Sequence, residues 1–451
     1  MNSQQTSWLK NLEIEQLTAM QKDALQTIPQ QHFVQLLAPT GTGKTVAFLL
    51  PLLQQVNMQQ DTVQAVIMSP SRELAIQTCS VVERMRSGVR VLALYGGRPA
   101  MEEHARLRHI KPQVVVVTPG RMLDHLDKGN VDVAAVQMCV IDEFDKMLDI
   151  KFRDEVFRLV KALRHAQHVV LVSATDDKEA VAPIIALHGL PLTIQPEGQQ
   201  GEDGNLTVPS QIRHWIVRSP ERDKLETLRR LLPQLAEGAT VVFVAHRESA
   251  DRVGTFLRSQ GFVCSIFHGG LEQEDRERAL FTFSNGASNV LVSTDLSARG
   301  LDISELRSVV HYHLPQKRNE FVHRCGRTGR WTSRGDSYLL VGPEETVPDF
   351  VTEALQECDL TNGEQQRMRP QPPNRVALYI GKGKEHKICR GDVVGFLCRQ
   401  GGLNAGDIYR VDIRPRCAYA LVSRSVWQKA VKGCDGAKIK GIKTRVERMN
   451  S

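Results

Sequence analysis

A glycine-rich turn lies early in the chain, between an apolar run and a segment with helical periodicity. The apolar run covers residues 36–38, the helical segment covers 46–53, and the turn contains Pro39, Thr40, Gly41, Thr42, Gly43, Lys44 and Thr45. Backbone N–H groups of such a turn, together with the helix N-terminus, cradle phosphates. Lys44 supplies charge for the β- and γ-phosphates of a nucleotide, and the Thr45 hydroxyl is a ligand for Mg²⁺. Ala38 replaces the usual first glycine of this pattern, but the strand-to-helix context predicts a nucleotide site.

Two adjacent carboxylates follow another apolar run. Residues 138–141 lead directly into Asp142 and Glu143, and Phe144 and Asp145 come next. At the end of a strand, Asp142 can ligate Mg²⁺ while Glu143 lies beside the attacking water. The alternative is an ordinary helix start, because acidic residues are common in the first helical turn. The upstream phosphate-binding turn favours the catalytic pair.

Arginine and glycine are concentrated over residues 323–330. Arg327 and Arg330 could stabilise the charge that develops on a transferred phosphoryl group, as arginine fingers do from a neighbouring domain. The alternative is a solvated basic loop. Because the other two motifs of phosphoryl transfer are present, we predict a catalytic role for these arginines.

Two similar sets of short apolar runs could carry these residues. They are rich in Val and Ile and bounded by turn residues, as in strands that are buried on both faces of a parallel sheet. A polar, glycine-rich stretch over 197–204 separates the sets, and a proline-rich stretch over 365–374 ends the second. We therefore predict two tandem parallel-sheet α/β domains, over residues 1–200 and 206–363. The expected strands are 34–38, 65–68, 114–117, 138–141 and 169–172 in the first domain, and 212–217, 240–244, 264–267, 290–292, 308–311 and 336–341 in the second.

The last segment, residues 374–451, differs in charge and in pattern. It contains 17 Lys and Arg against 6 Asp and Glu, a net charge of +11, whereas the rest of the chain carries −4. Such a basic module suggests a polyanionic partner, since Lys and Arg replace the counterions of phosphates; the alternative is a merely solubilising surface. Strands expected at 376–380, 408–413, 417–422 and 443–446, with helices near 392–399 and 425–432, predict a small split βαβ domain.

The bulk composition is typical of globular protein, with 41% hydrophobic and 24% charged residues. No apolar run approaches the roughly 20 residues that cross a bilayer, and the N-terminus lacks the features of a signal peptide. Nine scattered cysteines form no C-x-x-C pair, which argues against a zinc site or a disulfide framework. We expect reduced thiols, a cytoplasmic location, a monomer and no membrane partner.

Taken in order over about residues 8 to 345, these motifs resemble those of the DEAD-box RNA helicases. The resemblance implies two RecA-like domains that form a cleft closing on ATP and Mg²⁺, and it identifies Gln21 as the reader of adenine. Thr40 to Thr45 match the nucleotide-binding motif, Asp142 to Asp145 the acidic motif, and Ser173 with Thr175 the motif that links hydrolysis to strand separation. The RNA contacts that it implies in the first domain are Arg72, Gly97, Thr118 and Arg121.

The second domain continues the resemblance. Residues 242–244 match motif IV, and Arg327 and Arg330 lie in the family's last motif. The resemblance assigns Asp302 to the nucleotide, and Gln273, Arg276 and Thr294 to RNA. There are also departures: Phe144 replaces the alanine that names the family, which should change packing more than chemistry. Gln4 stands where the family has an aromatic residue, so either Trp8 stacks on adenine instead or that contact is absent.

The C-terminal segment resembles the RNA-binding domain of the DbpA-type subgroup, on residues 378–383, 390–395, 408–413 and 438–443. That resemblance implies docking on structured large-subunit ribosomal RNA. Tyr379, Tyr409 and Tyr419 lie on expected strands and could stack bases, although packing is the more common role of strand aromatics. Lys382 and Lys440 are the leading candidates for phosphate contacts; the other candidates are Lys384, Lys387, Arg414, Arg416, Lys438 and Lys443.

The sequence thus predicts an RNA-dependent ATPase that locally unwinds or remodels structured RNA, with ribosome assembly as its setting. One alternative is an RNA clamp or scaffold whose ATPase times its residence on RNA, and another is a DNA translocase. A duplex-unwinding assay distinguishes the first alternative, and stimulation of the ATPase by RNA against DNA distinguishes the second.

Overall fold

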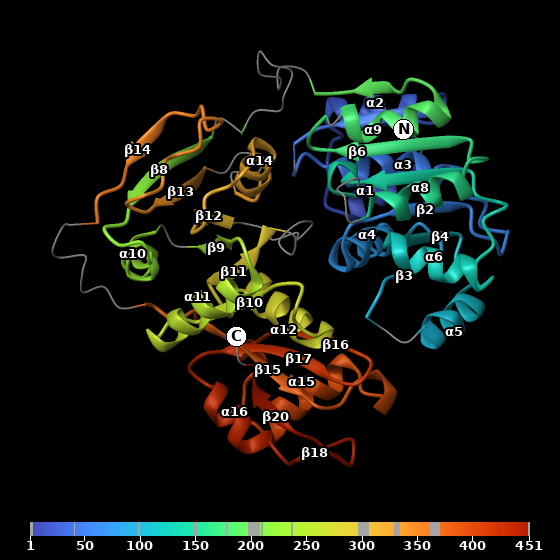
Figure 1. Ribbon diagram of the computed structural model, residues 1–451. Coiled ribbons are helices and arrows are strands. Elements are labelled where there is room, and N and C mark those ends of the chain that lie inside the picture. The colour runs from blue at the N-terminus through green and yellow to red at the C-terminus, as the bar shows by residue number, and fades with distance from the viewer. Residues whose placement is uncertain are drawn as a thin grey trace. The chain divides into compact units, whose positions relative to one another are not determined.

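The structure is a computed structural model that describes residues 3–39, 41–97, 100–147, 152–176, 178–196, 208, 211–235, 238–295, 306–328, 334–360 and 370–449. The chain divides near residue 209 into two compact units. The first unit contains one α/β domain, and the second contains another α/β domain together with a small C-terminal domain (Figure 1).

The first α/β domain is built on a seven-stranded parallel sheet with the order β3-β4-β2-β5-β6-β1-β7. Its strands are β1 (Phe33–Leu37), β2 (Ala65–Met68), β3 (Val91–Leu94), β4 (Val114–Val117), β5 (Met138–Asp142), β6 (His168–Ser173) and β7 (Leu192–Ile194). Its helices are α1 (Ser3–Asn11), α2 (Ala19–Thr27), α3 (Lys44–Gln55), α4 (Arg72–Met85), α5 (Ala100–Ile110), α6 (Pro119–Asp127), α7 (Phe144–Met147), α8 (Arg153–Ala162) and α9 (Lys178–His188).

Alternate side chains of each strand enter two different cores, one on each face of this sheet. In β4, Val114 and Val116 pack with α3 and α4, whereas Val115 and Val117 pack with α6 and α8. Successive side chains of a strand point to opposite faces, so a strand covered on both sides is apolar throughout. This burial explains the continuous apolar runs in the sequence.

The second α/β domain repeats the architecture, with the parallel order β10-β11-β9-β12-β13-β8-β14. Its strands are β8 (Ile212–Arg218), β9 (Ala239–Val244), β10 (Cys264–Phe267), β11 (Val290–Thr294), β12 (Leu306–His311), β13 (Gly335–Val341) and β14 (Leu355–Glu357). Its helices are α10 (Leu225–Leu231), the 3₁₀ helix η1 (Leu232–Gln234), α11 (Arg247–Ser259), α12 (Gln273–Ser284) and α14 (Arg318–Cys325).

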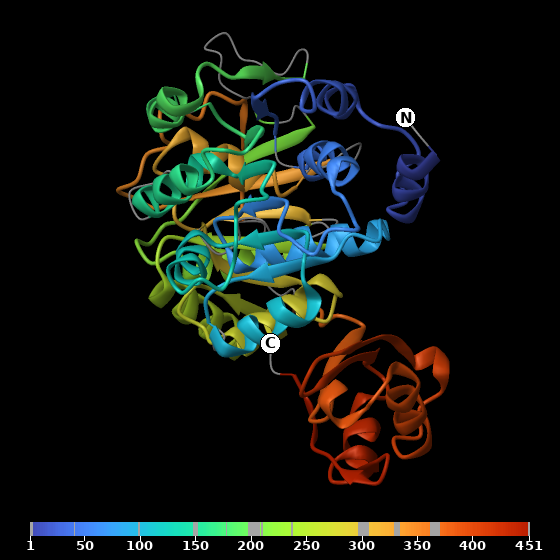
Figure 2. The same ribbon diagram turned by 90° about the vertical axis from the view of Figure 1, so that its right-hand side faces the viewer.

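The C-terminal domain has an antiparallel sheet of order β16-β17-β15-β20, with α15 and α16 on one face (Figure 2). Its strands are β15 (Arg375–Ile380), β16 (Ile408–Ile413), β17 (Ala418–Ser423) and β20 (Val446–Arg448), and a separate hairpin joins β18 (Lys438–Ile439) to β19 (Ile442–Lys443). Its helices are α15 (Arg390–Arg399), α16 (Trp427–Cys434), and the 3₁₀ helices η3 (Lys384–His386) and η4 (Ala405–Asp407).

The predicted fold class, two RecA-like parallel-sheet domains followed by a small α+β domain, is confirmed. The strand expected at 443–446 was wrong in detail, because β19 ends at Lys443 and the sheet strand β20 begins at Val446. The edge strands β3, β7 and β14 had not been predicted. Among the described residues, no helix combines the length and the apolar character needed to span a membrane.

Candidate nucleotide and RNA sites

The carboxyl ends of three neighbouring strands gather the predicted phosphate chemistry in the first domain. Strand β6 lies between β1 and β5, so Ser173 pairs with Leu37 in one ladder, and Asp142 pairs with Val172 in the other. The phosphate-binding turn follows β1 directly. Ligands of open parallel sheets bind at this carboxyl edge. Strands β1, β5 and β6 therefore bring together the phosphate-binding turn, the acidic motif and the motif of Ser173 and Thr175.

Backbone conformation explains the glycines of the turn. Gly41 and Gly43 both have φ of +86°, a left-handed conformation that glycine adopts without a steric penalty. A Cβ on Gly43 would also lie 2.3 Å from Nε2 of Gln21. The Lys44 ammonium donates to the carbonyl oxygens of Ala38 and Pro39 at 2.5 and 2.9 Å. Burial lowers the pKa of Lys44 to about 8, although Asp142 opposes the shift.

Gln21 joins the turn to the start of α2. Its side-chain oxygen accepts from the Thr18 backbone N–H at 3.0 Å, and its Nε2 donates to the Gly43 carbonyl at 3.2 Å. The Thr18 hydroxyl accepts from the Gln21 N–H in return, which completes a capping box. Gln21 is buried, so the residue expected to read adenine is already held against the phosphate-binding turn.

The acidic motif combines backbone strain with buried charge. Asp142 ends β5, and Glu143 follows with φ of +52°, a conformation rare for residues other than glycine. Lys146 donates to Oε2 of Glu143 at 2.6 Å, and its side chain is only 3% exposed. Burial, and then the neighbouring Glu143, raise the pKa of Asp142 to about 7, whereas Lys44 lowers it. Lys146 had not been singled out in the sequence.

Hydrogen bonds connect the acidic motif to the end of β6. The Thr175 hydroxyl donates to Oδ2 of Asp145 at 3.0 Å, and the Thr175 N–H donates to the Ser173 hydroxyl at 3.0 Å. Thr175 therefore links Asp145 to Ser173.

Two departures from the family pattern are explained by packing. Phe144 is fully buried in the core on the α6 and α8 face, so the larger side chain fills a hydrophobic position. Trp8 is 7% exposed and lies in the opposite core with residues of α4, whereas Gln4 is exposed. Trp8 is thus a core residue, which favours the interpretation that the adenine stacking contact is absent.

The predicted RNA residues of the first domain lie at the same edge of the sheet, in the loops and first helical turns that follow β2, β3 and β4. Gly97 has φ of +94°, and a Cβ there would lie 2.3 Å from Nη1 of Arg72, so Gly97 leaves room for that guanidinium group. Thr118 is the N-cap residue of α6. Arg121 donates to Oε2 of Glu103 at 2.7 Å, so its guanidinium is anchored within the domain.

Glu103, which had not been predicted, organises this corner. It is 1% exposed and also accepts from His125 at 3.0 Å and from the Tyr95 N–H at 3.3 Å. Burial alone would raise the pKa of Glu103, but the hydrogen bonds from His125 and Arg121 lower it below its usual value. Glu103 therefore stays ionised and holds Arg121.

In the second domain, Gln273 and Arg276 begin α12. Nε2 of Gln273 donates to Oε1 of Glu277 at 3.3 Å, and the buried Arg276 guanidinium lies 5.3 Å from the ring centre of Phe267. Thr294 ends β11. Arg327 lies in the turn after α14 and is 5% exposed. Thr40, Asp302 and Arg330 lie outside the described residues.

A structural arginine supports the motif that contains Arg327. Arg324 makes a two-pronged ion pair with Asp295, with distances of 2.6 and 2.5 Å, and donates to the His313 carbonyl at 2.7 Å. Such a paired, planar contact fixes both the position and the orientation of the Arg324 guanidinium group. Arg324 thereby ties α14 to the end of β11.

The predicted contacts of the C-terminal domain have different environments. Lys440, at the tip of the β18–β19 hairpin, pairs with Asp392 at 2.8 Å and is 47% exposed; Lys382 is half-buried at the end of β15. Tyr419 is 1% exposed, which makes it a packing residue, whereas Tyr409 is 47% exposed. Arg414 pairs with Glu277 and Asp412, at 3.5 and 2.9 Å.

Comparison with protein families gives three matches along the chain. Residues 18–182 match the DEAD/DEAH box helicase family, residues 223–332 the helicase conserved C-terminal domain, and residues 377–448 the DbpA RNA binding domain.

Two curated relatives span nearly the whole chain. The ATP-dependent RNA helicase DbpA of Escherichia coli is 34% identical, and the alignment covers 95% of this chain and 94% of that protein. The protein of the same name from Bacillus subtilis is 27% identical, with 98% and 96% covered. Among solved structures, S. cerevisiae Dbp5 bound to RNA and ADP BeF3 has a TM-score of 0.72 and 26% identity, covering 81% of this chain and 95% of that one.

Proposed function

Because the chain belongs to the DEAD-box helicases and is an RNA-dependent ATPase, we propose that it locally unwinds or remodels structured RNA, and that ribosomal RNA is its substrate during ribosome assembly. The single observation that carries this proposal is the basic RNA-binding domain joined to a helicase core. The C-terminal domain selects the RNA, and the two α/β domains hydrolyse ATP to unwind or remodel it. We further propose domain boundaries of 1–200, 206–363 and 374–451, a monomeric chain and a cytoplasmic location.

The nucleotide chemistry is assigned to the carboxyl edge of the first sheet. Lys44 and the N–H groups from Thr40 to Gly43 hold the phosphates, and Gln21 recognises adenine. The hydroxyl of Thr45 and the carboxylate of Asp142 are hard oxygen donors of the kind that Mg²⁺ prefers, and a cation there would offset the raised pKa of the buried Asp142. Bound Mg²⁺ neutralises charge on the phosphate oxygens. Glu143 orients the attacking water.

Closure of the two α/β domains completes the site. Arg327 and Arg330 then stabilise the charge that develops on the γ-phosphoryl group, and Asp302 contacts the nucleotide. The solved relative bound to RNA and ADP BeF3 supports this arrangement, since its fold holds a nucleotide and an RNA together. Ser173 and Thr175 transmit the state of the acidic motif, because Thr175 bonds both Asp145 and Ser173.

RNA binds across both α/β domains in this proposal. Arg72, Gly97, Thr118 and Arg121 contact it from the first domain, and Gln273, Arg276 and Thr294 contact it from the second. An RNA bent by closure loses a few base pairs, and hydrolysis followed by opening releases it. Lys382 and Lys440 hold the structured part of the RNA on the C-terminal domain.

Two measurements test the proposal. The ATPase rate is measured with fragments of large-subunit ribosomal RNA and with unrelated RNA of the same length, and the fragments should stimulate it far more. Duplex unwinding is then followed with the wild type and with Glu143→Gln. Equal stimulation by all RNAs would contradict the ribosomal assignment. Stimulated hydrolysis without any unwinding would instead favour an ATP-timed RNA clamp.

A further inference from the structure

Strands β15 and β17 of the C-terminal sheet are largely buried on both faces. One face packs Val376, Leu378 and Ala420 against α15 and α16. The opposite face presents Tyr379, Tyr419, Leu421, Ala377 and Cys417, which form a second apolar cluster with Phe281, Ala287 and Met449. Helices α15 and α16 cover only the first cluster, so another element must cover the second.

Helix α12 of the second α/β domain is that element, and it lies on the side of β15 and β17 opposite to α15 and α16 (Figure 1). The Phe281 ring centre lies 5.2 Å from that of Tyr419, with the planes tilted by 54°. The Arg278 guanidinium lies 4.6 Å from the ring centre of Tyr379. Tilted aromatic pairs and cation–π contacts at these distances are attractive. Phe281 is only 5% exposed.

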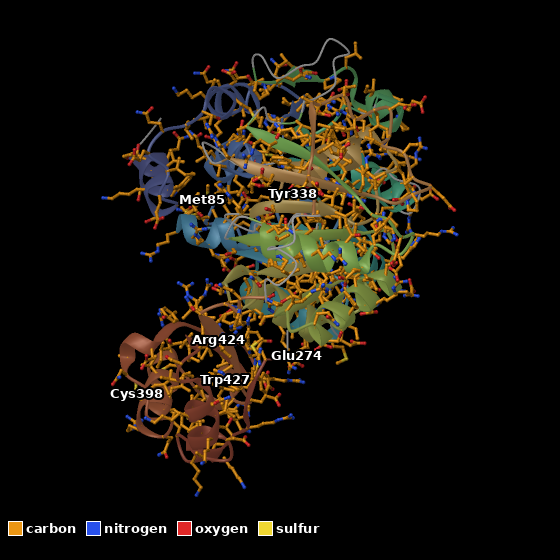
Figure 3. All side chains as sticks on the ribbon, turned by 90° about the vertical axis from the view of Figure 1, so that its left-hand side faces the viewer. Met85, Glu274, Tyr338, Cys398, Arg424 and Trp427 are labelled. Atoms are coloured by element: carbon orange, nitrogen blue, oxygen red, sulfur yellow. The ribbon has the colours of Figure 1, made fainter. Side chains whose placement is uncertain are left out.

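Polar contacts surround this apolar centre. Glu277 pairs with Arg414 at 3.5 Å, while Arg410 and Arg375 donate to the side chain and the backbone carbonyl of Asn285 at 3.0 and 3.3 Å. Glu274, on the same helix, accepts from Arg278 at 2.7 Å and is labelled in Figure 3. An apolar centre with a polar rim is the arrangement of a specific interface.

The same helix begins with the residues assigned to RNA. Gln273 donates to Glu277, and Glu277 pairs with Arg414 of the C-terminal domain. Helical spacing puts positions 274, 278, 281 and 285 on one face and positions 273 and 276 on a neighbouring face. Helix α12 thus offers one face to the C-terminal domain and another to the RNA.

We propose that α12 fixes the C-terminal domain on the second α/β domain, so that the two domains act as one rigid RNA-binding body. RNA held by the C-terminal domain is then presented to Gln273 and Arg276 at a set distance, a part of the inference that rests on the proposed function. The tyrosine face serves this docking and does not stack bases. Relative domain motion is the default within one chain unless the interface is large and hydrophobic; the apolar centre around Phe281 and Tyr419 opposes such motion here.

The first test measures docking without RNA. A donor and an acceptor dye are placed on the exposed Cys389 and on an exposed cysteine introduced by Ser259→Cys, after Cys358 and Cys398 are replaced by serine. The wild type should give one narrow, high-transfer population in single-molecule energy transfer. Phe281→Arg, which puts a cation beside Arg278 and Arg414, should lower and broaden it, and Phe281→Leu should not. An unchanged distribution in Phe281→Arg would overturn the proposal.

Charge reversal provides an independent check from both sides of the interface. Arg414→Glu places a third carboxylate beside Glu277 and Asp412 and should broaden the transfer distribution, whereas Arg414→Glu combined with Glu277→Arg should narrow it again. Broadening that persists unchanged in the double variant would contradict the assigned contact. Circular dichroism of each variant verifies that the fold is retained.

The second test measures coupling to RNA. The substrate is the ribosomal RNA fragment that best stimulates the ATPase, extended by a short duplex. Phe281→Arg should bind it as tightly as the wild type and retain ATPase activity on short single strands, but unwind the duplex about tenfold more slowly, the size of a typical coupling between sites. A flexible spacer between fragment and duplex should slow the wild type to the same rate. Equal unwinding by both proteins without a spacer would refute the rigid body. Because docking is measured without RNA, an absence of unwinding in the wild type would refute only the proposed function.

Discussion

At the scale of single residues, the carboxylate assigned to the attacking water is held by the lysine that directly follows its motif. Glu143 has a strained left-handed backbone and a buried partner in Lys146. Strained residues persist where surrounding contacts over-determine them. The Lys146 contact and the burial of Phe144 supply such contacts directly after the turn.

Glu143→Gln should keep ATP and RNA binding but lose turnover by at least about 100-fold, because the amide cannot accept the proton or orient water as a carboxylate does. Lys44→Ala should instead weaken nucleotide binding, since it removes the charge on the phosphates. Fluorescent nucleotide titrations and steady-state ATPase rates separate the two effects. Glu221→Gln, at an exposed position, is the matched control. Normal turnover by Glu143→Gln would remove Glu143 from the mechanism.

Lys146→Met should lower kcat by about 10- to 100-fold, the effect expected when a reacting group shifts slightly, with a smaller change in the KM for ATP. It should also destabilise the first domain by about 3 kcal/mol, because one partner of a buried ion pair is left alone. Lys146→Arg keeps the charge and should recover part of kcat. If kcat is unchanged in a folded Lys146→Met protein, Lys146 has no positioning role.

At the scale of elements, the sequence predicts what burial on two faces imposes. The inner strands of both parallel sheets contain continuous apolar runs, and β2 and β4 are apolar at every position. This signal does not depend on knowing the neighbours of a strand. Strands β7 and β14 are three residues long and largely exposed, so they leave no such signal. The nucleotide motifs were predictable because their glycines and carboxylates are local in sequence.

Contacts between distant segments could not be predicted in the same way. The ion pair of Arg121 with Glu103 depends on how α5 packs near α6. The ion pair of Arg324 with Asp295 joins α14 to the end of β11. Tyr419 lies on a strand whose outer face would be more open in an isolated sheet, and Phe281 of α12, far earlier in the chain, packs against it. Strand periodicity alone therefore allowed both stacking and packing for this tyrosine.

Buried histidines of the second domain predict an acid-sensitive element. Burial, with Arg324 and His214 nearby, holds the pKa of His311 well below 6.5, and burial also lowers the pKa of His214. The unfolded chain takes up protons near pH 6.5 while the folded form does not. The free energy of unfolding therefore has its full value above about pH 6.5. Below that pH it decreases by up to about 1.4 kcal/mol per pH unit for a fully buried histidine.

Urea unfolding of the full chain at pH 7.5, 6.5 and 5.5 measures this dependence through the second-domain transition. His311→Gln should reduce the dependence of the unfolding free energy on pH below pH 6.5. His165→Gln, at an exposed position of the first domain, should leave that dependence unchanged. An identical slope in His311→Gln and the wild type would show that other groups control the acid response.

At the scale of the whole molecule, catalysis is expected to require both α/β domains. Arg327→Lys should not restore the ATPase, because lysine lacks the planar fork of the guanidinium group, and loss of an arginine finger costs on the order of 10³-fold in other phosphoryl-transfer enzymes. RNA-stimulated ATPase rates measure the effect, with Arg222→Lys at an exposed position as the control. A fully active Arg327→Lys protein would exclude the finger role.

The charge distribution predicts how the chain anchors on RNA. A chain ending at residue 363 loses the segment that carries +11, so it should keep a folded ATPase that unspecific RNA stimulates weakly, and lose its preference for structured RNA. Binding by the full chain should weaken with salt, with a log–log slope of about −0.7 for each phosphate contact on single strands. Titrations at several salt concentrations compare the two chains. Equal preference and equal slopes would leave the C-terminal domain without a recognition role.

The doubly covered sheet has a consequence for any experiment that divides the chain. Cut free, the C-terminal domain would present Tyr379, Tyr419 and Leu421 to water, an aromatic platform of the kind that single strands stack on. Such a fragment would gain a loosely selective RNA site and a tendency to self-associate, because α12 would no longer cover this face. Introducing Tyr379→Ala into the fragment should abolish that added binding and leave its recognition of structured RNA. RNA affinities of the fragment therefore describe the intact protein only after the added binding is subtracted.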